Sequence, residues 1–297
     1  GASFINGGDV LNSGVELALN WNDNAGDFHY YIGVNGAYNK NVVGNIPNVD
    51  GIIHGRTNML FDNAKEFYRA ENGHSLGYWW GLQSDGIFQN QQEIDDHKAA
   101  NLGILQGSVA PGDVRFVDQN KDGKIDDADK VDLGNGMPSI TYGFSLGFDW
   151  RGLDFNVTAY GAAGNKIVQS YRNHANAYAN FTTAALERWT GEGTSNRMPR
   201  IEDTASNWKE FSDLYLQDGD YLRISNITLG YDFAKLTKVS WLSQLRLYVS
   251  VQNPFTFTKY DGMDPEIGYG MDSWVSGVDL GYYPHPRTYL VGLNIKF

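Results

Sequence analysis

The feature that most constrains the fold is a strict alternation of apolar and polar residues in long segments, most clearly near the end of the chain. The segment from Thr288 to Phe297 places its large apolar side chains on one face, namely Tyr289, Val291, Leu293, Ile295 and Phe297. This period of two indicates a β-strand with one apolar and one mostly polar face. Its length matches the roughly 9–11 residues that a tilted strand needs to cross a bilayer. Strands of soluble sandwiches are usually about 5–6 residues long. Taken alone, the segment fits a surface strand of a soluble β protein or the closing strand of an outer-membrane barrel.

Hydropathy does not decide between these two alternatives. No run approaches the ~20 apolar residues of a membrane helix, but a transmembrane barrel turns every second residue toward its lumen and so dilutes the apolar signal. The chain has 14% aromatic residues, including 18 Tyr and 8 Trp, and barrels concentrate such residues at both membrane interfaces. The composition therefore favours the barrel.

Charge and cysteine content exclude several other classes. The formal net charge of −12 argues against nucleic acid or an anionic membrane surface as a partner. The chain has no cysteine, which excludes disulfides, thiolate catalysis and zinc sites built on Cys. The first twelve residues lack the basic region and apolar core of a signal peptide, and 14–21 already alternates like a strand. We therefore expect a C-terminal fragment that begins within a domain.

The alternation predicts nine strands, of which the third is weak. They cover residues 14–21, 28–38, 60–71, 75–88, 140–150, 153–160, 221–233, 245–252 and 286–297. With the weak strand included, short and long connections alternate along the chain. Outer-membrane barrels show this sorting because their periplasmic turns are short and their extracellular loops long. Nine is an odd number and the first strand would have an unpaired edge in lipid, so we expect further strands outside this chain.

Six short stretches, spread over nearly the whole chain, carry a family resemblance. They read N-S-G-V-E-L (12–17), G-Y-W-W-G-L-Q-S-D-G-I-F-Q (77–89), P-G-D-V-R-F-V-D-Q-N-K-D-G-K-I-D (111–126), G-N-G-M-P-S-I-T-Y-G-F (134–144), Y-L-R-I-S-N-I-T-L-G-Y (221–231) and V-Q-N-P-F-T-F-T-K-Y-D-G-M-D-P-E (251–266). In this order, and with Phe297 last, they resemble the C-terminal half of the SusC/RagA family of TonB-dependent outer-membrane transporters.

The resemblance implies an all-β fold, a transmembrane antiparallel barrel of 22 strands, a number known for outer-membrane transporters. Residues 1–297 would supply about the last nine strands, and the plug domain, the TonB box and the earlier strands would lie outside this chain. The resemblance further implies a multi-pass protein of a Gram-negative, Bacteroidetes-type outer membrane that contacts lipid. Its partners would be a SusD-like lipoprotein and the TonB complex, and its function the import of oligosaccharides, or of peptides in some members. No substrate-binding residue can be carried over, because these loops share no family motif.

An alternative of another class is a soluble or surface-exposed β-rich protein that binds glycans and carries a structural calcium loop. Loop aromatics could stack on sugar rings, but for most of them packing within the loops or against a partner is the favoured interpretation. These residues are Tyr171, Tyr178, Phe181, Trp189, Trp208, Trp274, Tyr282 and Tyr283. Trp79 and Trp80 are adjacent in a predicted strand, so we expect one to face the lumen and the other the lipid or its interface.

The best local motif is a metal-binding pattern of the EF-hand type. Its ligand positions 1, 3, 5, 7, 9 and 12 are Asp118, Asn120, Asp122, Lys124, Asp126 and Asp129. Gly123 occupies position 6, where the loop turns sharply. Position 12 is Asp rather than Glu, and no helix pair flanks the loop. We expect a structural Ca²⁺, with Mg²⁺ as the alternative ion; the other interpretation is an acidic turn whose side chains bond their own backbone.

Nothing in the sequence predicts an enzyme. Glu187, Glu192, Glu202 and Asp203 share one segment and could include a glycosidase-like pair, but 35 acidic residues make such coincidences common. The six histidines show no ligand spacing, and no nucleophile motif or phosphate-binding loop is present. We therefore predict a non-catalytic protein.

Overall fold

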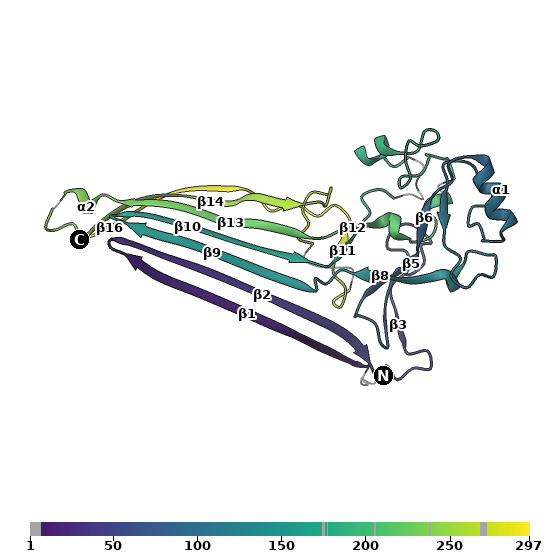
Figure 1. The fold of residues 1–297 in the computed structure, drawn as a ribbon, viewed down its shortest axis with the longest axis horizontal. Helices are drawn as coiled ribbons and strands as arrows, with labels where there is room; N and C mark the ends of the chain where they lie inside the picture. The colour runs from purple at the N-terminus through teal and green to yellow at the C-terminus, as the bar shows by residue number, and fades with distance from the viewer. Residues whose placement is uncertain (1–6, 174–175, 177, 205, 238, 268–271) are drawn as a thin grey trace.

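The computed structural model describes residues 7–297, except 174, 175, 177, 205, 238 and 268–271. Its main element is one long antiparallel sheet, at the left of Figure 1, with a layer of loops at one end. The strands of this sheet are, in chain order, β1 (Asp9–Ala25), β2 (Phe28–Gly44), β9 (Ile140–Trp150), β10 (Leu153–Ala163), β13 (Tyr221–Asp232), β14 (Gln244–Thr258) and β16 (Thr288–Lys296). Each strand pairs with the next one in this order, so the sheet is an antiparallel meander.

The register places apolar residues directly opposite one another across the whole sheet. One row joins Trp21, Ile32, Leu146, Val157, Ile227, Val251 and Tyr289. The neighbouring row lies on the other face and joins Asn20, Gly33, Ser145, Thr158, Asn226, Gln252 and Thr288. Because successive side chains of a strand point to opposite faces, the sheet has one apolar face and one polar face. The apolar face is uncovered: Trp21 is 60% exposed and Tyr289 71%.

The connections of this sheet are sorted by length. The short ones, 26–27, 151–152 and 233–243, lie at the end of the sheet away from the loop layer. The long ones, 45–139, 164–220 and 259–287, build the loop layer at the other end (Figure 1). Arg151 and Gly152 both have positive φ, of 50° and 94°, which lets the two-residue turn match the twist of its strands. Phe297 lies at the short-turn end, with its ring stacked on Trp241 at 5.8 Å between centroids.

Two of the nine predicted strands do not belong to this sheet. Residues 60–71 and 75–88 contribute only the short strands β4 (Tyr68–Glu71), β5 (Tyr78–Leu82) and β6 (Ser84–Ile87), which lie in the loop layer. The sheet therefore has seven strands among the described residues. Because two strands leave it together, the alternation of short and long connections is kept.

The prediction for Trp79 and Trp80 is wrong for the same reason. Trp79 is 0% exposed and packs in the loop-layer core, stacked on Phe67 at 6.0 Å. Trp80 lies between two cations, with Arg69 at 3.4 Å and Lys130 at 4.6 Å from its ring centroid. Neither ring lies in the seven-stranded sheet, because β5 pairs with β4 and β8 in a small sheet of the loop layer.

The loop layer has its own small sheets and its own core. Its remaining elements are β3 (Ile52–His54), α1 (Gln91–Ala99), β7 (Val114–Phe116), β8 (Lys130–Asn135), β11 (Lys166–Gln169), β12 (Leu216–Asp218), β15 (Val278–Asp279) and four 3₁₀ turns at 127–129, 183–187, 206–208 and 213–215. A further helix, α2 (Ala234–Thr237), lies in a short connection. The predicted antiparallel all-β class is confirmed.

Within the described residues, no helix combines the length and the apolar character needed to cross a membrane.

Candidate functional site

The loop layer contains a cavity of about 940 Å³, lined by the connection 164–220 and by the start of the connection 259–287. Three of the predicted loop aromatics, Tyr171, Phe181 and Trp208, line it. Phe181 is 51% exposed, and the guanidinium of Arg172 lies 4.1 Å from its ring centroid. Tyr171 is held in place by its hydroxyl, which donates to Asp279 at 2.7 Å.

The other loop aromatics divide into packed and exposed residues. Trp189 donates through Nε1 to Gln89 at 3.2 Å, and Trp274 packs edge-on against Tyr68. Tyr282 packs against the buried cluster of Ile167, Tyr260 and Ile267. Tyr178 and Tyr283 are almost fully exposed. Of the eight rings, three therefore line the cavity, three pack within the loops, and two are exposed.

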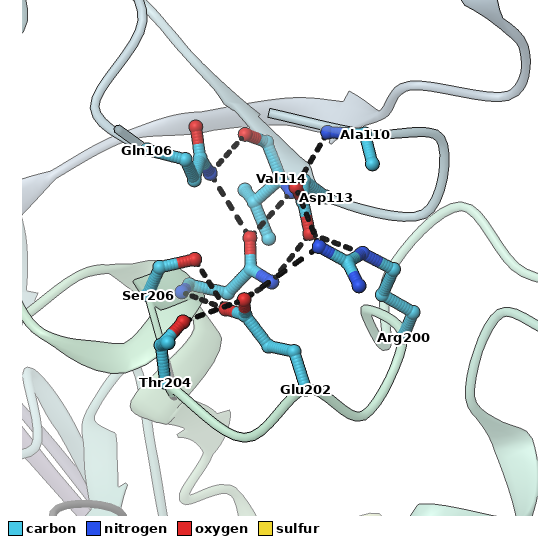
Figure 2. A network of polar contacts seen from close by, with 9 residues as sticks. Gln106, Ala110, Asp113, Val114, Arg200, Glu202, Thr204 and Ser206 are labelled. Atoms are coloured by element: carbon cyan, nitrogen blue, oxygen red, sulfur yellow. Dashed lines mark hydrogen bonds and ion pairs between the residues drawn. The ribbon is translucent and has the colours of Figure 1, made fainter. Parts of the chain in front are cut away.

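A polar network, drawn in Figure 2, includes Arg200 and Glu202, which line the cavity. Arg200 lines the cavity and binds Asp113 with two nitrogens, Nε to Oδ1 at 2.7 Å and Nη2 to Oδ2 at 3.2 Å. Asp113 is 0% exposed and also accepts from Asn207 Nδ2 at 3.0 Å and from the backbone of Ala110 at 2.8 Å. A carboxylate can accept this many bonds, so its buried charge is fully compensated.

Asn207 extends the same network. Its Oδ1 accepts from Gln106 Nε2 at 2.9 Å and from the backbone of Val114 at 2.8 Å. Burial raises the pKa of Glu202, but hydrogen bonds from Ser206, Thr204 and the Asn207 backbone outweigh it and hold that pKa below its usual range. The network thus ties the segment 106–114, which precedes the metal-like loop, to the cavity wall at 200–207.

The four acidic residues considered for glycosidase chemistry have different roles. Glu202 belongs to this network, and Glu192 accepts from Asn90 Nδ2 at 2.8 Å. Glu187 and Asp203 line the cavity and are exposed. Two of the four therefore serve as local structural acceptors.

The metal-like loop has the backbone of the predicted pattern. Asp118 is buried and accepts from the amides of Gly123 at 2.8 Å and Asp122 at 3.2 Å. Gly123 has φ of 84°, which only glycine adopts readily. Asp129 is also buried, and its two oxygens accept from the amides of Gln119 and Asp126.

The side chains of this loop do not converge on one point. No three of its carboxylates bring their oxygens within 4.8 Å of one another in the described structure. Asp122 bonds the Lys124 amide, and Asp126 bonds the Ala128 amide and caps the 3₁₀ turn. In the conformation described, the loop is an acidic turn bonded to its own backbone.

The described residues contain one group with metal-ligand spacing, formed by Asp264, Glu266 and His285. This group already has a counter-charge, because the buried Arg223 binds Asp264 at 2.5 Å and lies 3.4 Å from Glu266. His285 Nδ1 lies 2.9 Å from Asp264. These ion pairs connect two of the quoted stretches, 221–231 and 251–266. They link strand β13 of the main sheet to the connection 259–287.

No motif in the sequence marks Asp113, Arg200 or the basic residues that line the cavity as functional. Asp113 and Arg200 are separated by a long stretch of chain and each lies in a polar loop, so no local pattern marks them. Asp113 lies in the quoted stretch 111–126, which carries the family resemblance, but that resemblance implies no role for it.

No family model matches the chain. Among curated proteins, it is 30% identical over 300 residues to TonB-dependent receptor P3 of Formosa agariphila and 25% identical over 293 residues to TonB-dependent receptor SusC of Bacteroides thetaiotaomicron. Each match covers 98% of this chain, but only 29% and 27% of those proteins. The chain thus spans less than a third of the length of these relatives, which are receptors rather than enzymes.

Solved structures share the fold. The RagAB peptide importer in its open-open state matches with a TM-score of 0.70 at 20% identity, over 98% of this chain and 29% of that one. The structure titled RagAB peptide transporter matches with a TM-score of 0.68 at 21% identity, again over 98% of this chain and 30% of that one.

Replacing Arg200 with Ala should loosen the cavity wall, because it leaves the buried Asp113 carboxylate without its cation. Asn207 and Ala110 still donate to Asp113, so we expect a local cost of about 2–4 kcal/mol. Hydrogen exchange of the protein in detergent would measure it as faster exchange at 106–114 and 200–207. Lys209→Ala removes an exposed cation from the same connection and serves as the control. Equal exchange in both variants would show that the ion pair does not hold the wall.

Proposed function

Because the chain is a SusC/RagA-like segment of a TonB-dependent receptor, we propose that it forms part of the transmembrane wall and the extracellular loops of an outer-membrane importer. The observation that carries this proposal is the uncovered apolar row that crosses all seven strands. A soluble sheet would bury such a face against a second layer. Lipid is the solvent in which it can stay uncovered.

The two edges of the sheet indicate how the barrel is completed. Within the described residues, β1 and β16 each have one partner strand, so each leaves one edge unpaired. Unpaired backbone groups are not tolerated in lipid. We propose that residues 1–297 are the C-terminal part of a larger barrel of about 22 strands. The remaining strands and the plug domain belong to the rest of the protein, which also contacts the TonB complex.

We propose oligosaccharides as the cargo, delivered by a SusD-like lipoprotein at the loop layer, with peptides as the alternative. The SusC/RagA resemblance of the six quoted stretches implies the first, and the fold shared with the RagAB peptide importer keeps the second open. The cavity of about 940 Å³ has the size of a ligand site and lies at the end where the long loops gather. The soluble glycan-binding alternative fits less well, because it leaves the apolar face unexplained.

Import can be tested with fluorescently labelled oligosaccharides in cells that carry the intact protein. We expect uptake that is lost when TonB is deleted and when the loop residues 181–203 are replaced by a short linker, provided that the barrel still reaches the membrane. The control is binding at the cell surface, which should survive TonB deletion. Uptake that continues without TonB would contradict an energised importer.

The membrane wall can be tested with two arginine substitutions, one on each of the two opposite faces of β1. Leu17→Arg, on the apolar face near the middle of the strand, should destabilise the folded protein in bilayers by about 2–4 kcal/mol. Asn20→Arg, on the polar face, should cost little, because it can reach water. Denaturant titration in lipid vesicles measures both, and equal costs would argue against lipid on the apolar face.

We also propose that the loop 118–129 binds Ca²⁺ weakly and structurally, with Mg²⁺ as the alternative ion. Its spacing and the turn at Gly123 support this, and Asn120 and Asp122 are exposed and can rotate. The fit is incomplete, because the carboxylates now bond backbone amides. A carboxylate oxygen can nevertheless accept an amide and ligate an ion together. Affinities near 10⁻⁴–10⁻³ M are typical of extracellular calcium modules.

Calcium should raise the thermal stability of the loop layer. With 5 mM Ca²⁺ against a chelator, we expect about 1–2 kcal/mol, measured as an upward shift in the unfolding temperature. Asp122→Ala should abolish the shift while barrel assembly continues, and Mg²⁺ at the same concentration identifies the ion. An unfolding temperature that is the same with Ca²⁺ and with chelator would indicate that the loop 118–129 is an acidic turn that binds no ion.

A further inference from the structure

Three basic side chains from three separate segments meet at one strand of the cavity wall. Lys166 opens β11 and pairs with Asp218, at the end of β12. Arg197 Nη2 donates to the carbonyl of Leu216, on the same strand, at 3.2 Å. Lys259 follows β14, and all three residues line the cavity.

These three cations lower the pKa of the nearby Asp218 carboxylate. The pKa of Asp218 lies below its usual range, chiefly because Lys166 donates a hydrogen bond to it, and the charges of Lys166, Lys259 and Arg197 lower it further. One carboxylate therefore stands among three cations.

Two of these cations have no carboxylate partner of their own. Among the described residues, neither Arg197 nor Lys259 forms an ion pair, and both are exposed. The other acidic groups nearby also have partners: Asp213, whose charge interacts with Arg197, accepts from Ser84 Oγ at 2.9 Å, Asp261 accepts from Gln169 at 3.0 Å, and Glu202 belongs to the buried network. Glu187 and Asp203 also line the cavity, on other segments. Exposed cations at a cavity wall attract anionic groups and bind them with charge-assisted hydrogen bonds.

The chemistry next to the cations suits a saccharide. The amides of Gln169 and Gln217 bond each other at 2.9 Å, and Gln217 Oε1 accepts from the Asp261 amide. Side-chain amides, carboxylates and the exposed ring of Phe181 are groups that bind sugar hydroxyls and sugar faces. One common way to bind a peptide is to add it as a strand to a free sheet edge. The edge strand here, β12, is three residues long, and its Leu216 carbonyl already accepts from Arg197.

We propose that this cavity selects oligosaccharides that carry an anionic group, a carboxylate or a sulfate, and that Arg197 and Lys259 determine this specificity. The inference rests on the proposed import function and narrows its cargo. Lys166 and Asp218 hold the wall, while Arg197 and Lys259 contact the anionic group of the ligand.

The test measures binding to the intact protein in detergent by titration calorimetry at 150 mM NaCl. The probes are neutral galactotetraose, tetragalacturonate, a sulfated galactan tetrasaccharide and tetraglutamate. We expect at least one anionic saccharide to bind at least tenfold more tightly than galactotetraose, with an affinity that falls at 500 mM NaCl. The stronger of the two anionic saccharides identifies the group.

Variants then assign the residues. Lys259→Gln and Arg197→Gln should each weaken the anionic saccharide about tenfold and leave the neutral one unchanged. Arg197→Lys should restore most of the affinity, which shows that charge rather than packing is lost. Lys98→Gln, on the exposed face of α1, removes the same charge outside the cavity and should change nothing.

Three results would overturn the proposal. They are equal affinity for galactotetraose and the anionic saccharides, binding of no anionic saccharide, or tightest binding of tetraglutamate, which would make the cargo peptidic. TonB-dependent uptake is measured separately, so the absence of an anionic preference would not contradict the proposed import function. Uptake that does not depend on TonB would contradict the import function itself.

Discussion

The structure depends on one unbroken antiparallel ladder of backbone hydrogen bonds that runs from β1 to β16. Because each strand pairs with the next in the sheet, no long-range crossing is needed, and three connections can be very short. The ladder satisfies the backbone without help from solvent. One face of the sheet is then free to carry only apolar side chains, as the row from Trp21 to Tyr289 does. In lipid every backbone N–H and C=O group needs a hydrogen-bond partner within the protein, since no water reaches the backbone.

The loop layer follows different physics. It buries a core of its own, with Phe67, Trp79 and Tyr215 almost fully enclosed. It also buries charge, in the pairs Arg200–Asp113 and Arg223–Asp264. Buried pairs of this kind add little net stability, but each removes the freedom of a long loop to settle in another arrangement. The wall of the nearby cavity includes Arg200, and it also carries Arg197 and Lys259, which form no ion pair among the described residues.

How well the sequence predicted each element depends on what surrounds it. The strand 140–150 was predicted at its observed bounds, because one of its faces is apolar and the other polar along its whole length. Residues 75–88 are predicted as one strand of the wall, yet they form β5, which is largely buried, and β6, both in the loop layer. A strand buried on both faces does not need the period-two alternation of a wall strand. The loop 118–129 has the spacing of an ion site, but spacing does not say where carboxylates point. The Arg200–Asp113 pair had no local signal at all.

The sequence by itself determined the class of the fold and the faces of its sheet. Alternation is a local property, read within ten residues, and its register follows from short turns such as Arg151–Gly152. Only the tertiary structure decided how many strands enter the sheet, which loop residues are buried, and which cations meet at β12. Lys166, Arg197 and Lys259 lie in three segments far apart in the chain. Their meeting depends on how the long connections pack against one another, and that is set by contacts no single stretch of sequence contains.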